Sequence, residues 1–140
     1  MAAFFIFEVH TPYRLFFNGK VEYISMVLTD GEIGVYAHHS PFTAPVVSCI
    51  LRIKDEKGDQ HLAFITDGIL EVKDHKTVLM VDVAEWPAEI DIERARAAKQ
   101  KAEDSLQDSI HTAVRQFEVE NAKMKLRRAE YRLKAAELKV

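Results

Sequence analysis

Few residues in this chain have the types and spacing that catalysis or metal binding requires. His38 and His39 form a pair that could bind a metal ion, but no third ligand follows at a fixed spacing and Cys49 is the only cysteine. Ser40 lies beside His39, but no acid and no oxyanion donors accompany the two in the pattern of a catalytic triad. We therefore predict no metal site and no catalytic residue, and interpret the two histidines as part of a loop.

The carboxylates with the clearest structural use mark the start of a helix. Asp91, alone or with Glu89, offers an oxygen to the free N–H groups of a first helical turn. Pro87 cannot donate to a strand ladder and is a natural end for the preceding strand. Apolar residues alternate or run in short blocks before this stretch, and recur at spacings of three and four after it. The pattern predicts a β domain over residues 1–87 and a helical domain over residues 88–140.

Short apolar runs separated by turn residues fill the first domain. Asn18-Gly19 is the strongest of these turn signals and predicts a tight hairpin. Such a series is typical of an antiparallel sandwich or barrel with one modest core. We expect strands near residues 5–10, 14–17, 21–28, 33–36, 46–53, 62–65, 69–72 and 78–83, and turns at 18–19, 30–31, 37–41, 55–59 and 67–68.

Two helices are predicted in the second domain, at about residues 92–109 and 112–138, with the chain reversing at 107–111 to form an antiparallel hairpin. Alanines line the expected seam. Each buries little apolar surface, and burial stabilises by only about 25 cal/mol per Å², whereas alanine favours helix strongly. The pattern fits helices that persist singly and dock weakly. A static hairpin packed on the sandwich fits it equally well. The seam residues are Ala95, Ala98, Ala102, Ser105 or Leu106, and Ser109 on the first helix and Val119, Ala122, Leu126, Ala129, Leu133 and Ala136 on the second.

Charge is unevenly distributed between the two domains. Residues 1–87 carry 7 basic and 12 acidic side chains, a net charge of −5, and residues 88–140 carry 12 and 10, a net charge of +2. The acidic body argues against nucleic acid as its partner. The basic set on the second helix is by default a solvated surface, and it also suits an acidic protein partner. This set is Lys123, Lys125, Arg127, Arg128, Arg132 and Lys134.

Six motifs occur in an order and spacing that resembles the epsilon subunit of the F-type ATP synthase, which mitochondria call delta. The resemblance covers nearly the whole chain and implies a ten-stranded β-sandwich followed by a two-helix hairpin. The motifs are residues 9–12 (VHTP), 16–22 (FFNGKVE), 29–35 (TDGEIGV), 39–42 (HSPF), 68–72 (GILEV) and 90–95 (IDIERA).

The resemblance implies a non-catalytic rotor subunit that couples proton flow to ATP synthesis. Its sandwich would bind the gamma subunit and the membrane c-ring. Its hairpin would either fold on the sandwich or extend along gamma, where it inhibits ATP hydrolysis and the basic set contacts the catalytic beta subunit. The absence of a leader or transit peptide favours a peripheral position on the cytoplasmic face of a bacterial plasma membrane. The alternative is a free-standing adaptor whose hairpin forms a coiled coil with another protein.

In several members of this family the folded hairpin binds ATP, which implies a regulatory ligand but no required cofactor. The alternative to ATP binding is a purely structural role for these residues: Asp91 would cap the helix, and Arg94 would form an ion pair with Glu89 or Glu93. The residues that match the family's ATP motif are Ile90, Asp91, Arg94 and Ala95, the two second-helix arginines Arg128 and Arg132, and Glu85 at an acidic position before the first helix.

The chain departs from the family pattern at three places. Ala37-His38 stands where Pro-Gly is usual, and Asp67 stands where Gly is usual. Because Asp tolerates a positive φ better than most residues, we expect the second turn to survive. Trp86-Pro87 is unusual in the linker, and we expect it to stiffen the connection between the domains.

Overall fold

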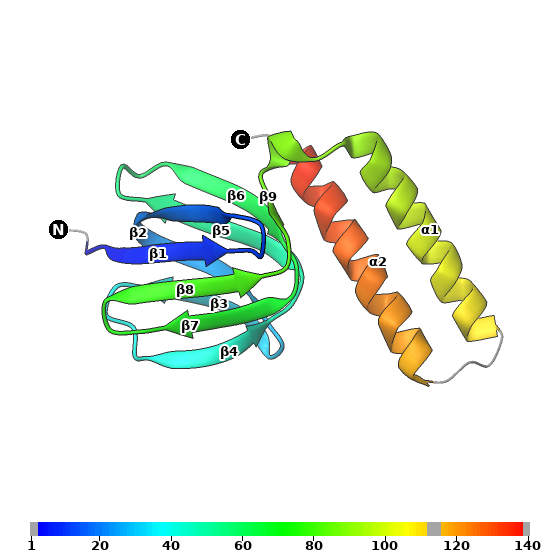
Figure 1. Ribbon diagram of the computed structural model, residues 1–140, viewed down its shortest axis with the longest axis horizontal. Coiled ribbons are helices and arrows are strands. Elements are labelled where there is room, and N and C mark those ends of the chain that lie inside the picture. The colour runs from blue at the N-terminus through cyan, green and yellow to red at the C-terminus, as the bar shows by residue number, and fades with distance from the viewer. Residues whose placement is uncertain (1–2, 112–115, 139–140) are drawn as a thin grey trace.

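The computed structural model describes residues 3–111 and 116–138, and within them nine strands form a continuous hydrogen-bonded sheet that folds into two layers (Figure 1). The strand order is β1-β8-β7-β4-β2-β5-β6-β9, with β3 paired to β2. The strands are β1 (Phe5–His10), β2 (Leu15–Leu28), β3 (Gly31–Tyr36), β4 (Phe42–Val46), β5 (Cys49–Asp55), β6 (Gln60–Ile65), β7 (Gly68–Val72), β8 (Lys76–Val81) and β9 (Ala84–Glu85).

The long strand β2 joins the two layers. Its first half pairs with β1, and its second half pairs with β3 and β5. A single pair, Leu28 with Val46, connects it to β4. The inward side chains of both layers form one apolar core, in which Phe7, Ile24, Leu51 and Leu79 are buried. The predicted β-sandwich is confirmed, with nine strands in the described residues where the family pattern implies ten.

The predicted hairpin at Asn18-Gly19 is wrong, because both residues lie inside β2. Asn18 pairs with Glu8 and Gly19 with Phe7 across the β1–β2 ladder. The chain reverses earlier, where Thr11 N–H donates to the Arg14 carbonyl oxygen (3.0 Å) and the Thr11 hydroxyl accepts from Arg14 N–H (3.1 Å). The predicted strands at 14–17 and 21–28 are therefore one strand.

Other strand boundaries differ from expectation in smaller ways. The run at 46–53 is divided between β4 and β5 at residues 47–48. Asp67 lies in the expected turn before β7, but its φ is not positive. Its carboxylate Oδ1 instead accepts hydrogen bonds from Ser48 N–H (2.7 Å) and the Ser48 hydroxyl (2.8 Å), which ties two turns together. His38, at the other departure from the family pattern, has φ 65°.

A helical hairpin follows the sandwich through one turn of 3-10 helix, η1 (Pro87–Glu89), and consists of α1 (Ile92–His111) and α2 (Gln116–Glu137). The predicted reversal at 107–111 is wrong, because α1 continues to His111. The predicted start of the second helix at Thr112 lies outside the described residues. In Figure 1, α2 lies beside the sandwich near β6 and β9, and α1 lies on the far side of α2.

The fully buried side chains of the hairpin are small, and the larger Tyr131 and Leu133 pack beside them partly buried. The buried residues of α2 are all alanines: Ala122, Ala129, Ala135 and Ala136. Ala95 of α1 joins the last two in a second apolar cluster, separate from the sandwich core, whose larger members on the sandwich are Leu62 and Phe64. Ala122, Ala129 and Ala136 of the predicted α2 seam are therefore buried, whereas its larger members are partly buried and Ala135 was not predicted. The α1 seam is more open, since Ala98 and Ser105 are exposed.

Candidate functional site

The predicted motif Ile90-Asp91-x-x-Arg94-Ala95 forms the start of α1. Asp91 caps the helix, because its Oδ1 accepts a hydrogen bond from Arg94 N–H (3.2 Å) and its carbonyl oxygen accepts one from Ala95 N–H (2.9 Å). Ile90 and Ala95 are buried in the second apolar cluster. The local role of this motif is therefore to begin α1 and to pack its first turn.

Arg132 and Glu85 form a two-point ion pair between α2 and the end of β9. Arg132 Nε donates to Glu85 Oε1 (2.9 Å), and Nη2 donates to Oε2 (3.1 Å). The Glu85 side chain is only 17% exposed. This parallel arrangement is the strong form of the Arg–carboxylate contact, and it fastens the C-terminal half of α2 to the sandwich.

Arg128 is exposed and makes no hydrogen bond or ion pair with any residue that the structure describes. It lines two cavities together with Arg132. One cavity, of about 570 Å³, lies between α1 and α2. The other, of about 410 Å³, lies between α2 and the edge of the sandwich and is also lined by Glu85. Arg128 is thus a charged side chain that lines two cavities and has no partner among the described residues.

The structure brings together only part of the predicted ATP site. Glu85, Arg128 and Arg132 line one cavity, whereas Asp91 and Arg94 line neither of these two. The predicted ion pair of Arg94 with Glu89 does not form, because the Glu89 carboxylate binds Arg14. The Arg94 side chain is exposed and has no hydrogen bond or ion pair within the described part of the chain.

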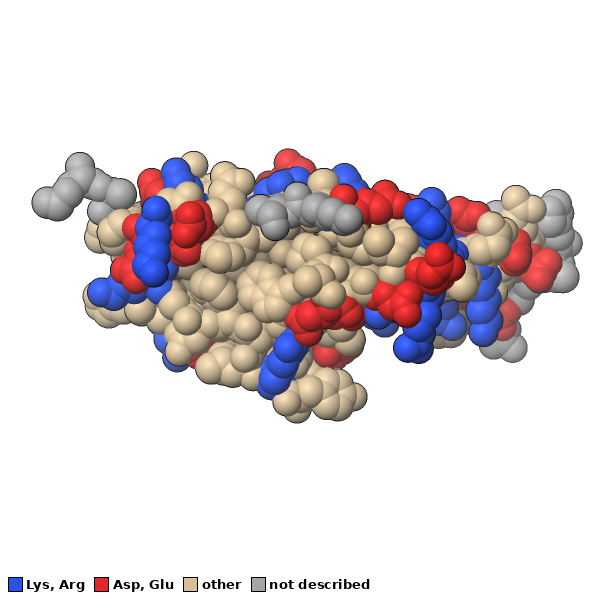
Figure 2. Space-filling view, turned by 90° about the horizontal axis from the view of Figure 1, so that it is seen from above, with Lys and Arg blue, Asp and Glu red and all other residues tan. Residues whose placement is uncertain are grey.

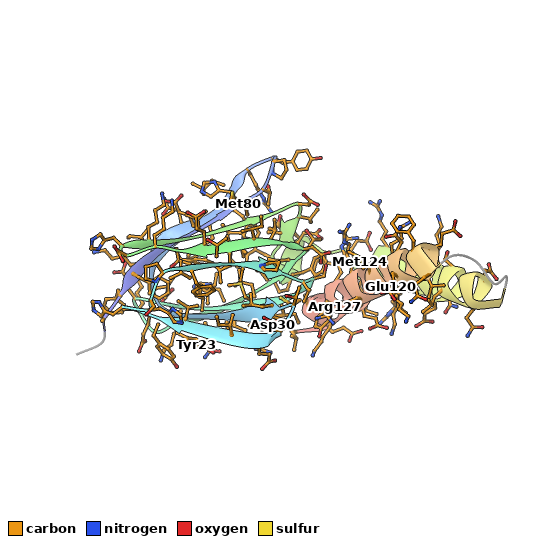
Figure 3. All side chains as sticks on the ribbon, turned by 90° about the horizontal axis from the view of Figure 1, so that it is seen from below. Tyr23, Asp30, Met80, Glu120, Met124 and Arg127 are labelled. Atoms are coloured by element: carbon orange, nitrogen blue, oxygen red, sulfur yellow. The ribbon has the colours of Figure 1, made fainter. Side chains whose placement is uncertain are left out.

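Some members of the predicted basic set on α2 contact the sandwich, and others face the solvent. Arg127 Nε donates to the Ser48 carbonyl oxygen (3.0 Å), and its guanidinium lies 4.8 Å from the centre of the Tyr131 ring. Lys134 lies over the same ring at 5.8 Å. Lys123 and Lys125 are exposed. Figure 3 shows Arg127 where α2 meets the sandwich and Met124 farther along the helix.

Comparison with known proteins gives the same two-part division over nearly the whole chain. The family described as "ATP synthase, Delta/Epsilon chain, beta-sandwich domain" matches residues 5–87, and "ATP synthase, Delta/Epsilon chain, long alpha-helix domain" matches residues 88–137. The chain belongs to the ATP synthase delta/epsilon family.

Individual relatives extend this result. The chain is 43% identical over 135 residues to the ATP synthase epsilon chain of Ruminiclostridium cellulolyticum, covering 96% of both chains. It is 42% identical over 133 residues to that of Caldicellulosiruptor bescii, covering 95% of this chain and 93% of the relative. In fold, it is similar to a chain of the Euglena gracilis mitochondrial ATP synthase, with a TM-score of 0.79 and 23% identity, covering 96% of this chain and 81% of that one.

One surface of this family member that the sequence did not reveal is a row of exposed apolar side chains on β2, β8, β7 and β4, with His10 of β1 between the first two. Leu15 and Met80 flank His10 in the β1–β2 and β1–β8 pairings, and Ile69 pairs with Met80 and with Pro45. Leu15, Met80 and Ile69 are each about half exposed, at 51%, 45% and 46%. Strand register alone aligns these residues, so no local pattern could have identified the row. Figure 3 shows Met80 on the layer opposite that of Tyr23.

Titration shifts in the described residues have local causes outside the predicted site. Burial raises the pKa of the Cys49 thiol to about 11. Hydrogen bonds from Lys76 and His10 lower the pKa of Glu8, and a hydrogen bond from His61 lowers that of Asp55. Within the described chain, no group of three His, Cys, Asp or Glu residues could hold a metal ion, and no helix is long and apolar enough to cross a bilayer.

Proposed function

We propose that this chain is a non-catalytic rotor subunit of an F-type ATP synthase, which couples proton flow to ATP synthesis and inhibits ATP hydrolysis through its helical hairpin. The observation that carries the proposal is the 43% identity to an ATP synthase epsilon chain over 96% of both chains. A match of that length includes the sandwich, the linker and both helices. It therefore favours the rotor subunit over a free-standing adaptor that shares only the hairpin.

The inhibitory mechanism requires a hairpin that can leave the sandwich at modest cost. The fully buried residues that the helices contribute are alanines, and the larger Tyr131, Leu133 and Leu138 are only partly buried, so separation exposes a limited apolar surface. The two polar attachments, Arg127 to Ser48 and Arg132 to Glu85, exchange for hydrogen bonds to water. These properties support two accessible positions, folded and extended, whose balance a partner or ligand can shift.

We assign two partners to separate surfaces. The apolar row of Leu15, Met80, Ile69 and Pro45 suits the gamma subunit, because exposed apolar side chains aligned on one sheet face favour a protein partner. The basic set on α2 suits an acidic segment of the catalytic beta subunit, and Figure 2 shows Lys and Arg side chains alternating with Asp and Glu on the face of the hairpin in view. We propose the c-ring as the third partner, at the cytoplasmic face of a bacterial plasma membrane.

ATP is the regulatory ligand that we propose for the folded hairpin. Arg128 has no partner among the described residues and lines both cavities with Arg132, and Glu85 lines one of them. An arginine fork suits phosphate oxygens. ATP bound between α2 and the sandwich would contact groups that separate when the hairpin extends, so it would stabilise the folded position by binding that state preferentially.

Removal of the hairpin tests the inhibitory role. In a reassembled ATPase complex, a chain that ends at Ile90 should give a higher rate of ATP hydrolysis than the full chain. The truncated chain must still co-purify with gamma, which controls for loss of assembly. An unchanged rate of hydrolysis would leave the coupling role intact and rule out inhibition by the hairpin.

Calorimetric titration with ATP tests the ligand site on the full-length chain. Because a hydrogen bond to a charged group contributes about 1.5–3 kcal/mol, Arg128→Ala should weaken ATP binding by about tenfold or more. Lys123→Ala is the matched control, since it removes an exposed charge from the same helix away from both cavities. Equal heats for the wild type and Arg128→Ala would exclude Arg128 from the site.

A further inference from the structure

The linker between sandwich and hairpin is bound to the sandwich at its carboxyl end by Glu89. Arg14 Nη2, from the β1–β2 turn, donates to Glu89 Oε2 (2.8 Å) and Oε1 (3.1 Å) and also to the Ala84 carbonyl oxygen (3.2 Å). Glu89 Oε1 in turn accepts a hydrogen bond from Trp86 N–H (3.0 Å). One arginine of the sandwich therefore holds both β9 and η1.

The amino end of the linker is held by the Trp86 ring. It stacks on Phe16 of β2, with ring centres 4.3 Å apart and planes 24° apart. It also meets the edges of the Phe17 and His61 rings at 6.4 and 6.2 Å. The Arg14 guanidinium lies 4.9 Å from the Phe16 ring centre. The Arg14–Glu89 ion pair and the Phe16–Trp86 stack are therefore in contact with each other.

Contacts with the sandwich become sparse beyond Ile90. Ala95 is the only buried residue in the part of α1 whose side chains are described, and α1 rests mainly on α2 (Figure 1). Ile90 itself is buried against the cluster of Leu62 and Phe64, and its backbone is extended, with φ −90° and ψ 127°. It thus separates the hydrogen-bonded turn of η1 from the first turn of α1.

We infer that residues 86–90 form part of the sandwich platform and that the hairpin pivots between Ile90 and Asp91. The inference rests on the proposed function, in which the hairpin leaves the sandwich. Arg14, Glu89 and Trp86 are then positioning residues that fix the origin and direction of the moving arm. Trp86-Pro87, which the sequence indicated as a stiffened linker, acts as an anchor that stays in place when α1 and α2 depart.

Two covalent bridges in the full chain test this pivot. The first joins Arg14→Cys to Glu89→Cys with a short bis-maleimide, and the second joins Glu85→Cys to Arg132→Cys, in place of the side-chain ion pair that links the sandwich to α2. Native Cys49 is buried and its pKa is raised to about 11, so it should not react. Each bridged chain is assembled with its ATPase partners, and the rate of ATP hydrolysis is measured before and after bridging.

The pivot predicts that the 85–132 bridge abolishes inhibition and that the 14–89 bridge leaves it unchanged. Loss of inhibition with both bridges would show that the linker must move, which would overturn the inference. If neither bridge changed inhibition, the proposed function would fail instead. A second measurement then tests the position of the pivot without relying on inhibition of the ATPase.

That measurement uses Trp86, the only tryptophan in the chain, as a reporter. Ala135→Asp places a carboxylate at a fully buried contact and should displace α2; Arg127→Ala with Arg132→Gln is the substitute if that variant does not fold. Faster thiol labelling at Ala136→Cys, which is 4% exposed when docked, confirms displacement. The near-ultraviolet circular dichroism of the Trp86–Phe16 stack should persist, and its disappearance would disprove the pivot.

Discussion

Arg127, Arg128 and Arg132 have the same charge on adjacent turns of α2 and three different environments. Arg127 donates to the Ser48 carbonyl oxygen, Arg132 binds the Glu85 carboxylate, and Arg128 has no partner among the described residues. Their spacing predicts a basic helix surface but does not distinguish them. The difference arises because the sandwich supplies an acceptor beside two of the three side chains.

The buried thiol of Cys49 provides a prediction about pH. Its pKa is about 11 in the folded chain against an ordinary value of 9.0, so the unfolded chain loses its proton first as pH rises. The free energy of unfolding should therefore fall between pH 9 and 11, by about 2–3 kcal/mol for a single proton. Urea unfolding at several pH values measures this, and Cys49→Ala, which lacks the thiol, should show a correspondingly smaller fall. An equal fall in both chains would contradict the assignment.

Among the elements, β2 shows how pairing overrides a local turn signal. Asn-Gly favours a two-residue hairpin because both residues accept a positive φ, yet Gly19 is extended and pairs with Phe7. The Thr11–Arg14 turn has already reversed the chain, and a continuous β2 pairs with β1 and then with β5. The ladder hydrogen bonds gained over the full strand outweigh the local preference.

Two glycine substitutions test this account of the strands. A Cβ at Gly19 would meet only the Phe17 ring, at an ordinary 3.5 Å, so Gly19→Ala should be neutral or stabilise by about 0.5 kcal/mol. A Cβ at Gly68 would overlap the Met80 carbonyl oxygen, and Gly68→Ala should destabilise by about 2–3 kcal/mol. Urea midpoints followed by Trp86 fluorescence measure both. A large loss at Gly19 would indicate that a turn there is required.

The alanine seam explains both the approach of the two helices and the cavity between them. Ala122 and Ala129 of α2 are buried, and together with Ala98 of α1 they line the cavity of about 570 Å³. Methyl groups permit close approach and fill little volume. The seam therefore joins α1 to α2 while leaving open space beside Arg128.

At the scale of the whole molecule, the buried apolar residues form two separate clusters, and this separation determines whether the hairpin can leave the sandwich. The sandwich core contains large buried side chains such as Phe7 and Leu70, whereas the fully buried residues of the hairpin, such as Ala95 and Ala135, are small and belong to a second cluster that they share with Leu62 and Phe64 of the sandwich. The sandwich therefore does not depend on the hairpin for its core. A hairpin attached in this way can separate while the platform stays folded.

The contribution of Arg127 to docking can be measured by hydrogen exchange. The hydrogen bond from its charged guanidinium to Ser48 is partly exposed to solvent, so we expect a contribution of about 1 kcal/mol rather than the full range for charged groups. Arg127→Ala should accelerate exchange in the C-terminal half of α2 by about fivefold. Lys123→Ala should leave exchange there unchanged. Equal effects of the two substitutions would mean that the Ser48 contact does not hold α2.

Local sequence patterns were enough to predict the division into a β part and a helical part, the Asp91 cap and much of the α2 seam. The sequence also carried the family resemblance that the comparisons confirm. These features depend on local periodicity, on capping chemistry or on motifs that are contiguous in the chain. The spacing of Arg128 and Arg132 placed both on one helix for the same reason.

Tertiary structure alone decided which carboxylate each arginine binds, where Asn18-Gly19 lies, and that Arg14 anchors Glu89. Arg132 and Glu85 are 47 residues apart and Arg14 and Glu89 are 75 apart. Contacts at such separations depend on strand register and on how the hairpin lies against the sandwich, because side chains far apart in sequence meet only after the strands have paired. The pivot between Ile90 and Asp91 follows from those contacts and from no pattern in the linker itself.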